Sequence, residues 1–402
     1  MNTSVTSAAM PRACDSDPAC RSVPGWVFLL GAAIFVVTTA EFIVAGLMPT
    51  LAAAFSVTVP ETGFLIALFA LGMTLGGPIV TALLLALGVP NRPALLWLLG
   101  LFLAASTLAA LATDYPVLAL ARTLQGVASA GCFGVAITLC AAHVRPEIRG
   151  RAVSVVLAGL MIAPVMGVPG AALISQAFGW RASFWGIVAL AALALAAIGV
   201  GVPRTERQAG ASLAANLGAL RSGRLWAAYA TSGLIIGATF AAFSYVTAIM
   251  TEVGGFSPSA IPLLLAGYGV ANVVGNLVVG RLADRYTIPV LGGGLAILAT
   301  ALATFAAFAG NPVISTAAFL AVGLVGVSLN PAMVARVMRA AEPSPLVNSF
   351  HTSVITGGLA FGTWAGGAAI DLGLGLTAPL WVGAGLAVLG LLSLAPRRAR
   401  LT

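Results

Sequence analysis

The sequence predicts an all-α protein that crosses a membrane twelve times, in two pseudo-symmetric bundles of six helices. Of its 402 residues, 60% are hydrophobic and only 7% are charged, which is too few to cover a water-soluble surface. Apolar segments of about twenty residues or more alternate with short polar loops, the pattern of helices that span a bilayer. Membrane β-strands are excluded because they are shorter and alternate in polarity.

The basic residues fall almost entirely on one side of this layout. All 19 are arginine; Arg181 alone is expected on the opposite side, and Arg122 lies within a span. Because cytoplasmic loops are rich in Arg and Lys, we expect the arginine-rich side and both termini to be cytoplasmic in a multi-pass plasma-membrane protein. The same bias accounts for the net charge of +8 without a nucleic-acid partner.

Polar stretches divide the chain into five parts. The segment 203–224 places Leu213, Leu217 and Leu220 at helical spacing, which fits an amphipathic surface helix; a loose linker is the alternative. The predicted parts are a cytoplasmic tail at 1–24, six helices in 25–202, a cytoplasmic linker at 203–224, six helices in 225–395 and a cytoplasmic tail at 396–402.

The first span, 26–49, carries one acid in its interior. At about 1.5 Å of rise per residue, Glu41 lies roughly 22 Å from Trp26 and roughly 12 Å from Pro49, so its side chain reaches neither boundary. An ionised carboxylate in hydrocarbon costs at least about 2.5 kcal/mol, so such a residue normally faces water or a partner. Glu41 is therefore a candidate functional residue. The alternative is a thinned bilayer or a hydrogen-bonded polar site inside the bundle.

The fourth span, 116–141, carries Arg122 and Gln125. Arg122 lies about 10 Å from the nearer boundary, so its long side chain could reach the interface. Alternatively it faces Glu41, because the two spans run in opposite directions and the two residues lie at similar depth.

The fifth span, 152–177, is rich in residues that bend or thin a helix. Prolines remove backbone donors and glycines remove side-chain bulk, so we expect a bent, closely packed helix. A packing role without any part in transport is the alternative. The residues concerned are Gly159, Pro164, Gly167, Pro169 and Gly170.

The second half repeats the layout of the first but not its buried charge. Its seventh and tenth spans carry no ionisable side chain, and aromatic and amide groups stand out instead. A site with apolar walls and few polar anchors suits apolar ligands. The candidate substrate contacts from both halves are Thr38, Gln125, Phe240, Phe243, Tyr245, Asn272 and Asn276.

Four segments resemble the major facilitator superfamily, and more narrowly its twelve-span drug:proton antiporters, including bacterial chloramphenicol exporters. The resemblance covers nearly the whole chain from residue 26 to residue 394. The segments are 41–49, 121–126, 159–170 and 179–185. The fifth-span segment is the most specific of them.

The resemblance implies two six-helix domains that rock about a central cavity. It implies that Arg122 belongs to a proton-transfer motif, and that the fifth helix seals the interface between the domains, with the glycine face at 358–366 as a plausible mate. It also implies a cytoplasmic gating motif at Gly280, Arg281, Asp284 and Arg285. The equivalent loop of the first half, 88–92, has lost its acid, so gating there is in doubt.

Together these features predict proton-driven export of a small, apolar, drug-like compound, with chloramphenicol or a related antibiotic as the example that the resemblance offers. Glu41 would take up and release the proton, and Arg122 would set the balance between its charged and neutral forms. The alternative is a proton-coupled exporter or importer of an endogenous metabolite such as a sugar or an amino-acid derivative.

An enzyme is not expected, because the two histidines lie far apart and no nucleophile stands beside a base. The four cysteines have neither disulfide nor metal spacing, so we expect no metal and no cofactor other than the proton gradient as energy source. The expected partners are the lipid bilayer and a small-molecule substrate, and the resemblance implies a monomer.

Overall fold

The computed structural model describes residues 23–145, 148–203, 222–341 and 345–394. The tails expected at 1–24 and 396–402 and the linker expected at 203–224 lie almost wholly outside the described residues. The described chain is helical apart from short turns. The all-α prediction is confirmed.

The six spans expected in the first half are present as helices. Asp114 begins the fourth by accepting a hydrogen bond from the Val117 N–H, and Pro116 occupies the first turn, where its missing N–H costs nothing. The elements are α1 (Gly25–Phe55), α2 (Val59–Leu87), α3 (Asn91–Leu111), α4 (Tyr115–His143), α5 (Arg149–Ile162), a π-helical turn (Ala163–Gly167), α6 (Val168–Phe178) and α7 (Trp180–Gly201).

The second half follows the same course. Within the described residues, 11 helical stretches are long and apolar enough to cross a membrane, and a twelfth apolar helix, α15, has 15 residues. The elements are α9 (Gly223–Phe243), α10 (Val246–Ala248), a π-helical turn (Ile249–Val253), α11 (Ile261–Ala307), α12 (Pro312–Val325), α13 (Asn330–Ala340), α14 (Pro345–Ala369), a π-helical turn (Ile370–Leu374) and α15 (Ala378–Leu392).

The eighth and ninth spans, expected at 258–279 and 288–309, are joined without a loop. Helix α11 covers both, and only Tyr286, with φ −125° and ψ 39°, departs from helical geometry. Pro289 follows in the next turn and cannot donate to the main chain one turn before it. The chain therefore reverses at a bend of a single residue.

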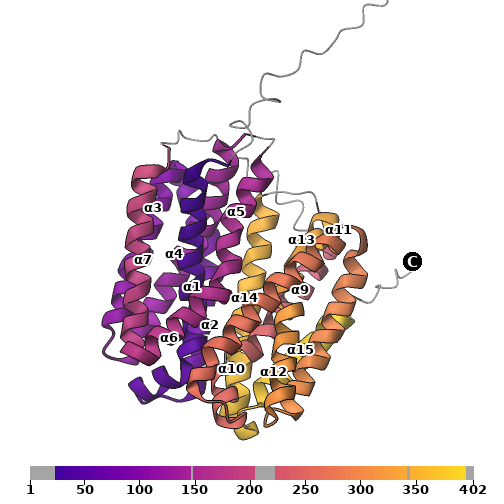
Figure 1. The fold of residues 1–402 in the computed structure, drawn as a ribbon. Helices are drawn as coiled ribbons and strands as arrows, with labels where there is room; N and C mark the ends of the chain where they lie inside the picture. The colour runs from indigo at the N-terminus through magenta and orange to yellow at the C-terminus, as the bar shows by residue number, and fades with distance from the viewer. Residues whose placement is uncertain (1–22, 146–147, 204–221, 342–344, 395–402) are drawn as a thin grey trace, which may run out of the picture.

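The two halves of the chain lie side by side, the first in indigo to magenta and the second in orange to yellow (Figure 1). Helix α2 packs on α14, the broken fifth helix packs on α11, and α1 also contacts α10. We call the end that carries the turns at 56–58, 112–114, 254–257 and 308–311 the arginine-poor end. The opposite end, with the turn at 88–90, the end of α4 at His143 and the bend at Tyr286, is the arginine-rich end.

The fifth spanning helix is bent and tightly packed, as its composition predicts. Its ladder of hydrogen bonds loosens into the π-helical turn between α5 and α6; Pro164 lies in this turn, and Pro169 lies in the first turn of α6. A methyl group on Gly159 would overlap the carbonyl oxygen of Gly31, and one on Gly167 would overlap the Thr39 side chain. Gly170, by contrast, has open space around it.

The prediction that the glycine face at 358–366 packs on this helix is wrong. The glycine face of α14 packs against α9 within the second half: Gly358 lies on Gly233, and Gly362 lies on Gly237. Two glycine stripes can bring their backbones together, and that contact occupies the face. The fifth helix instead meets α11, where a methyl group on Gly269 would stand 2.6 Å from the main chain of Pro164.

Candidate functional site

Glu41 lies in the middle of α1 where the helix is enclosed by protein. Every residue from 36 to 48 is buried, and Glu41 itself is 7% exposed. Helix α1 contacts α2, α4 and the fifth spanning helix of its own half and α10 of the other half. The acid is therefore held inside the protein, close to the meeting of the two halves.

Arg122 is fully buried and binds the main chain of α1. Its Nη1 donates to the Ala40 carbonyl at 2.7 Å and its Nη2 to the Glu41 carbonyl at 3.0 Å. Its Nε donates to the Leu65 carbonyl of α2 at 3.4 Å, and its guanidinium lies 4.3 Å from the ring centre of Phe69. The snorkelling alternative does not describe this arrangement, because the guanidinium points into the bundle and is 0% exposed.

Arg122 and Glu41 are brought together through the backbone. The hydrogen bond from Arg122 to residue 41 goes to the carbonyl oxygen and not to the carboxylate. The positive charge nearby favours a negative carboxylate, whereas burial opposes it. A proton can therefore join or leave Glu41 without breaking the bonds that hold α1, α2 and α4 together.

Gln125 completes the support of Arg122. Its Oε1 accepts from Arg122 Nη1 at 3.0 Å, and its Nε2 donates to Ser106 Oγ on α3 at 3.0 Å. Ser106 in turn donates to the Phe102 carbonyl. Both ends of the amide are thus used inside the first half, so its role in this structure is to orient the guanidinium, not to face the other half.

Aromatic rings from both halves meet at Phe42, the residue that follows Glu41 in α1. Phe42 of α1 stacks on Phe240 of α9 with ring centres 5.4 Å apart, and its edge meets Phe243 at 6.0 Å. Phe243 packs on Tyr268 of α11 at 4.7 Å, and Tyr268 stacks on Phe319 of α12 at 4.9 Å. We call Phe42, Phe240, Phe243 and Tyr268 the aromatic cluster; it joins α1 of the first half to α9 and α11 of the second.

The other predicted contacts are dispersed around this cluster. Thr38 lies one turn before Phe42 on the same face of α1 and is 0% exposed. Asn272 and Asn276 follow Tyr268 at one-turn intervals along α11, the first buried and the second half-buried. Tyr245 lies apart, because its hydroxyl donates to the Thr363 carbonyl of α14.

The sequence interpretation missed Phe42 and Tyr268. Phe42 directly follows the acid in the first-span segment, and this position next to Glu41 was the available signal. Tyr268 stands between Gly267 and Gly269 in the eighth span. A lone aromatic flanked by glycines in a spanning helix marks a place where another element packs closely against the ring.

Hydrogen bonds between the halves lie at the arginine-poor end and in the middle of the bundle. Thr247 Oγ1 donates to the Ala45 carbonyl at 2.7 Å, and Thr74 Oγ1 lies 2.9 Å from Thr356 Oγ1. The Ala45 carbonyl is available because Pro49, one turn later in α1, has no N–H to offer it. In this state the two halves are therefore closed together at the arginine-poor end.

The family model described as "Major Facilitator Superfamily" matches residues 30–344 and 238–401. The chain belongs to the major facilitator superfamily. A chloramphenicol resistance protein of Streptomyces lividans is 33% identical over 381 residues, which cover 94% of this chain and 97% of that protein. The inner membrane transport protein YdhP of Escherichia coli (strain K12) is 30% identical over 359 residues, covering 89% and 92%.

The fold is that of solved transporters. A bacterial homologue of the human lysosomal transporter Spinster, in an inward-facing and occupied conformation, superposes with a TM-score of 0.69 at 16% identity and covers 92% of this chain and 93% of that one. Membership of the superfamily makes the protein a transporter of a small molecule, embedded in a lipid bilayer. Its described residues form 11 long apolar helices and a twelfth shorter one.

The segment expected to be a gating motif lies at the bend of α11. Arg281 and Arg285 are exposed at the arginine-rich end, and the Arg285 guanidinium lies 5.3 Å from the Tyr286 ring centre. The Asp284 side chain is outside the described residues. In the corresponding loop of the first half, Arg92 donates to the Gly199 carbonyl of α7, so it joins two helices of the same half.

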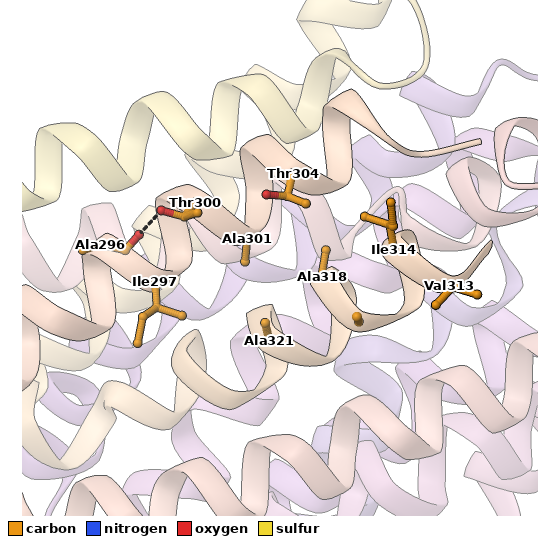
Figure 2. A pocket seen from close by; sticks show the side chains of 10 residues that line it. Ala296, Ile297, Thr300, Ala301, Thr304, Val313, Ile314, Ala318 and Ala321 are labelled. Carbon is orange, nitrogen blue, oxygen red and sulfur yellow. Dashed lines mark hydrogen bonds between the residues drawn. The ribbon is translucent and has the colours of Figure 1, made fainter. Parts of the chain in front are cut away.

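An apolar groove of about 580 Å³ lies between α11 and α12, away from the site (Figure 2). Its walls include Ile297 and Val313, which are 50% and 78% exposed, and Thr300, whose hydroxyl is already bonded to the Ala296 carbonyl. An exposed apolar groove on a membrane protein suits contact with lipid chains. Among the residues that the structure describes, no group of three His, Cys, Asp or Glu side chains could hold a metal.

Proposed function

We propose that this transporter exports small, largely apolar compounds, with chloramphenicol as the first candidate, in exchange for protons. The observation that carries the proposal is a buried acid, Glu41, beside a buried Arg122 and next to aromatic rings from both halves. The chloramphenicol resistance protein of Streptomyces lividans supports the choice of compound.

The proposed orientation places the arginine-rich end and both termini in the cytoplasm of a plasma-membrane protein that acts as a monomer. The positive-inside rule supports this choice. The closed arginine-poor end then faces outward, so this state would load its substrate from the cytoplasm. Opening of that end would release the substrate and expose Glu41 to outside protons.

The proposed coupling depends on the charge of Glu41. A neutral Glu41 costs little to enclose, whereas an ionised one opposes closure around it. Proton uptake from outside would therefore permit the return to the closed state, and release to the cytoplasm would restore the carboxylate. Because Arg122 holds the backbone of residue 41 and not its carboxylate, the proton can leave without disturbing the helix contacts.

The test is proton release from detergent-purified protein on addition of chloramphenicol, together with export against a gradient in proteoliposomes. Glu41→Gln should abolish both. Glu61→Gln is the matched control, because Glu61 is exposed and only caps α2 through Thr58, so this variant should keep both. Uphill export by Glu41→Gln would exclude the proposed role of Glu41.

A second candidate is export of an endogenous metabolite, since a probable sugar efflux transporter of Mannheimia succiniciproducens is 29% identical over 331 residues. The aromatic cluster disfavours sugars, which need several fixed hydrogen-bonding groups. Growth inhibition across antibiotic classes in an efflux-deficient host separates the two. Protection against aromatic antibiotics supports drug export, and protection against accumulated sugar alone supports the metabolite.

A further inference from the structure

Two buried hydroxyl groups in the described structure have no hydrogen-bond partner on the protein. They are Thr38 Oγ1, on a residue 0% exposed, and Tyr268 Oη, on a residue 3% exposed. A buried polar group without a partner costs about 1–3 kcal/mol, and buried hydroxyls are nearly always bonded to protein, water or ligand.

Neighbouring hydroxyls in the same region are satisfied. Tyr245 donates to the Thr363 carbonyl, Thr247 to the Ala45 carbonyl, and Thr239 to the Ile235 carbonyl. The region therefore provides partners for buried hydroxyls as a rule, and the two exceptions need an explanation of their own.

The two exceptions border the same aromatic cluster from opposite halves. Thr38 lies one turn from Phe42 on one face of α1. Tyr268 packs on Phe243 with ring centres 4.7 Å apart and an angle of 35° between the rings. Phe42 and Phe240 stack across the junction at 5.4 Å and 21°, so the contact between the halves is made by rings. Each half adds to this cluster a residue with an unpaired hydroxyl, Thr38 one turn from Phe42 and Tyr268 beside Phe243.

We propose that the aromatic cluster is the slot for an aromatic ring of the transported compound, and that the hydroxyls of Thr38 and Tyr268 donate to oxygen acceptors on that compound. This rests on the proposed function and adds a substrate class: uncharged aromatic compounds that carry nitro, carbonyl or ether oxygens. An inserted ring would replace the Phe42–Phe240 contact with two similar stacking contacts. Glu41, one residue before Phe42, disfavours an anion in the slot.

Loss of the Tyr268 hydroxyl should change binding and stability in opposite directions. Tyr268→Phe removes a partnerless polar group, so the midpoint of thermal unfolding without ligand should stay constant or rise. The same change removes one neutral hydrogen bond to the ligand, so affinity for chloramphenicol should fall about threefold to tenfold. Calorimetric titration of the full chain in lipid nanodiscs measures the affinity.

Tyr229→Phe is the matched control, because the Tyr229 hydroxyl is buried, donates to the Val347 carbonyl and belongs to none of the candidate substrate contacts. It should lower the unfolding midpoint and leave chloramphenicol affinity unchanged. A second pair tests the ring slot: Phe240→Leu should weaken binding more than Phe305→Leu, which removes an equally buried ring 6.3 Å from Phe319 at the far side of the cluster.

Three results would overturn the proposal: no chloramphenicol binding by the unaltered protein, full affinity in Tyr268→Phe, or a loss of stability in Tyr268→Phe equal to that in Tyr229→Phe. Failure of the coupling scheme is a separate outcome. Glu41→Gln should still bind chloramphenicol in nanodiscs. If this variant also exports against a gradient, the proposed proton role of Glu41 is wrong, but the proposed aromatic slot is unaffected.

Discussion

The hydrogen bond from Thr247 to the Ala45 carbonyl predicts how closure of the arginine-poor end can be weakened. Pro49 deprives this carbonyl of its helical donor, and Thr247 of the other half supplies the replacement at 2.7 Å. Thr247→Val keeps the shape of the side chain and removes the donor. In the closed state the buried carbonyl then has no partner, whereas in an open state water can reach it.

The expected magnitude follows from the cost of an unpaired buried carbonyl, about 1–3 kcal/mol, which shifts the closed-to-open ratio by about 5-fold to about 140-fold. The assay is electron–electron distance measurement between spin labels at Phe178 and Gly310, which are exposed on opposite halves at the arginine-poor end. Thr247→Val should increase the population with the longer distance.

A double-mutant cycle isolates the cause. Pro49→Ala returns an N–H to α1 and gives the Ala45 carbonyl a donor within its own helix, so Thr247→Val should shift the distances less in that background. Thr251→Val is the control, because the Thr251 hydroxyl bonds only carbonyls of its own segment, those of Thr247 and Ala248. An unchanged closed population in Thr247→Val, or an equal effect of Thr247→Val with and without the Pro49→Ala change, would refute the reasoning.

Two further substitutions test the support of the site and the contact between halves. Arg122→Lys replaces a planar fork that reaches both the Ala40 and Glu41 carbonyls with a single ammonium, so chloramphenicol export in proteoliposomes should fall at least about tenfold; unchanged export would contradict the cross-linking role. Gly269→Ala places a methyl group against the main chain of Pro164 and should reduce the closed population in the same distance assay, whereas Gly170→Ala, which meets open space, should not.

The helical layout was predictable because the bilayer imposes it on the sequence. Apolar length fixes each span: the fourth, expected at 116–141, is α4 (Tyr115–His143), and the fifth, expected at 152–177, extends from the start of α5 at Arg149 to the end of α6 at Phe178. The approach of Arg122 to Glu41 was also predictable, because rise per residue and opposite helix directions set their depths. The hydrogen bond from the guanidinium to the carbonyl of Glu41 could not be predicted, because depth alone does not distinguish the carbonyl of this residue from its carboxylate.

Helix partners could not be read from glycine content. A glycine stripe shows that a face can approach another backbone closely, but it does not say which one. From the sequence, the face at 358–366 could pack on the fifth helix or on α9. In the structure it packs on α9. The aromatic cluster could not be predicted for the same reason, because Phe42 and Tyr268 contact rings that are distant in the sequence.

The groups proposed to bind the proton and the substrate, and the carbonyl that joins the two halves, all lie within two turns of α1. Between Thr38 and Ala45, about 10 Å along the axis, lie an unpaired hydroxyl, the acid, the ring that meets α9 and the carbonyl that accepts from Thr247. Arg122 holds the main chain of the same segment from α4. A hydrogen bond such as that from Thr247 contributes only about 0.5–1.5 kcal/mol net, so a ring entering the slot or a change of charge on Glu41 is large enough to compete with it. Because these groups share one stretch of helix, a shift of α1 at any of them moves the others, and in the proposed mechanism this links ion movement to substrate movement without an ion pair that must break.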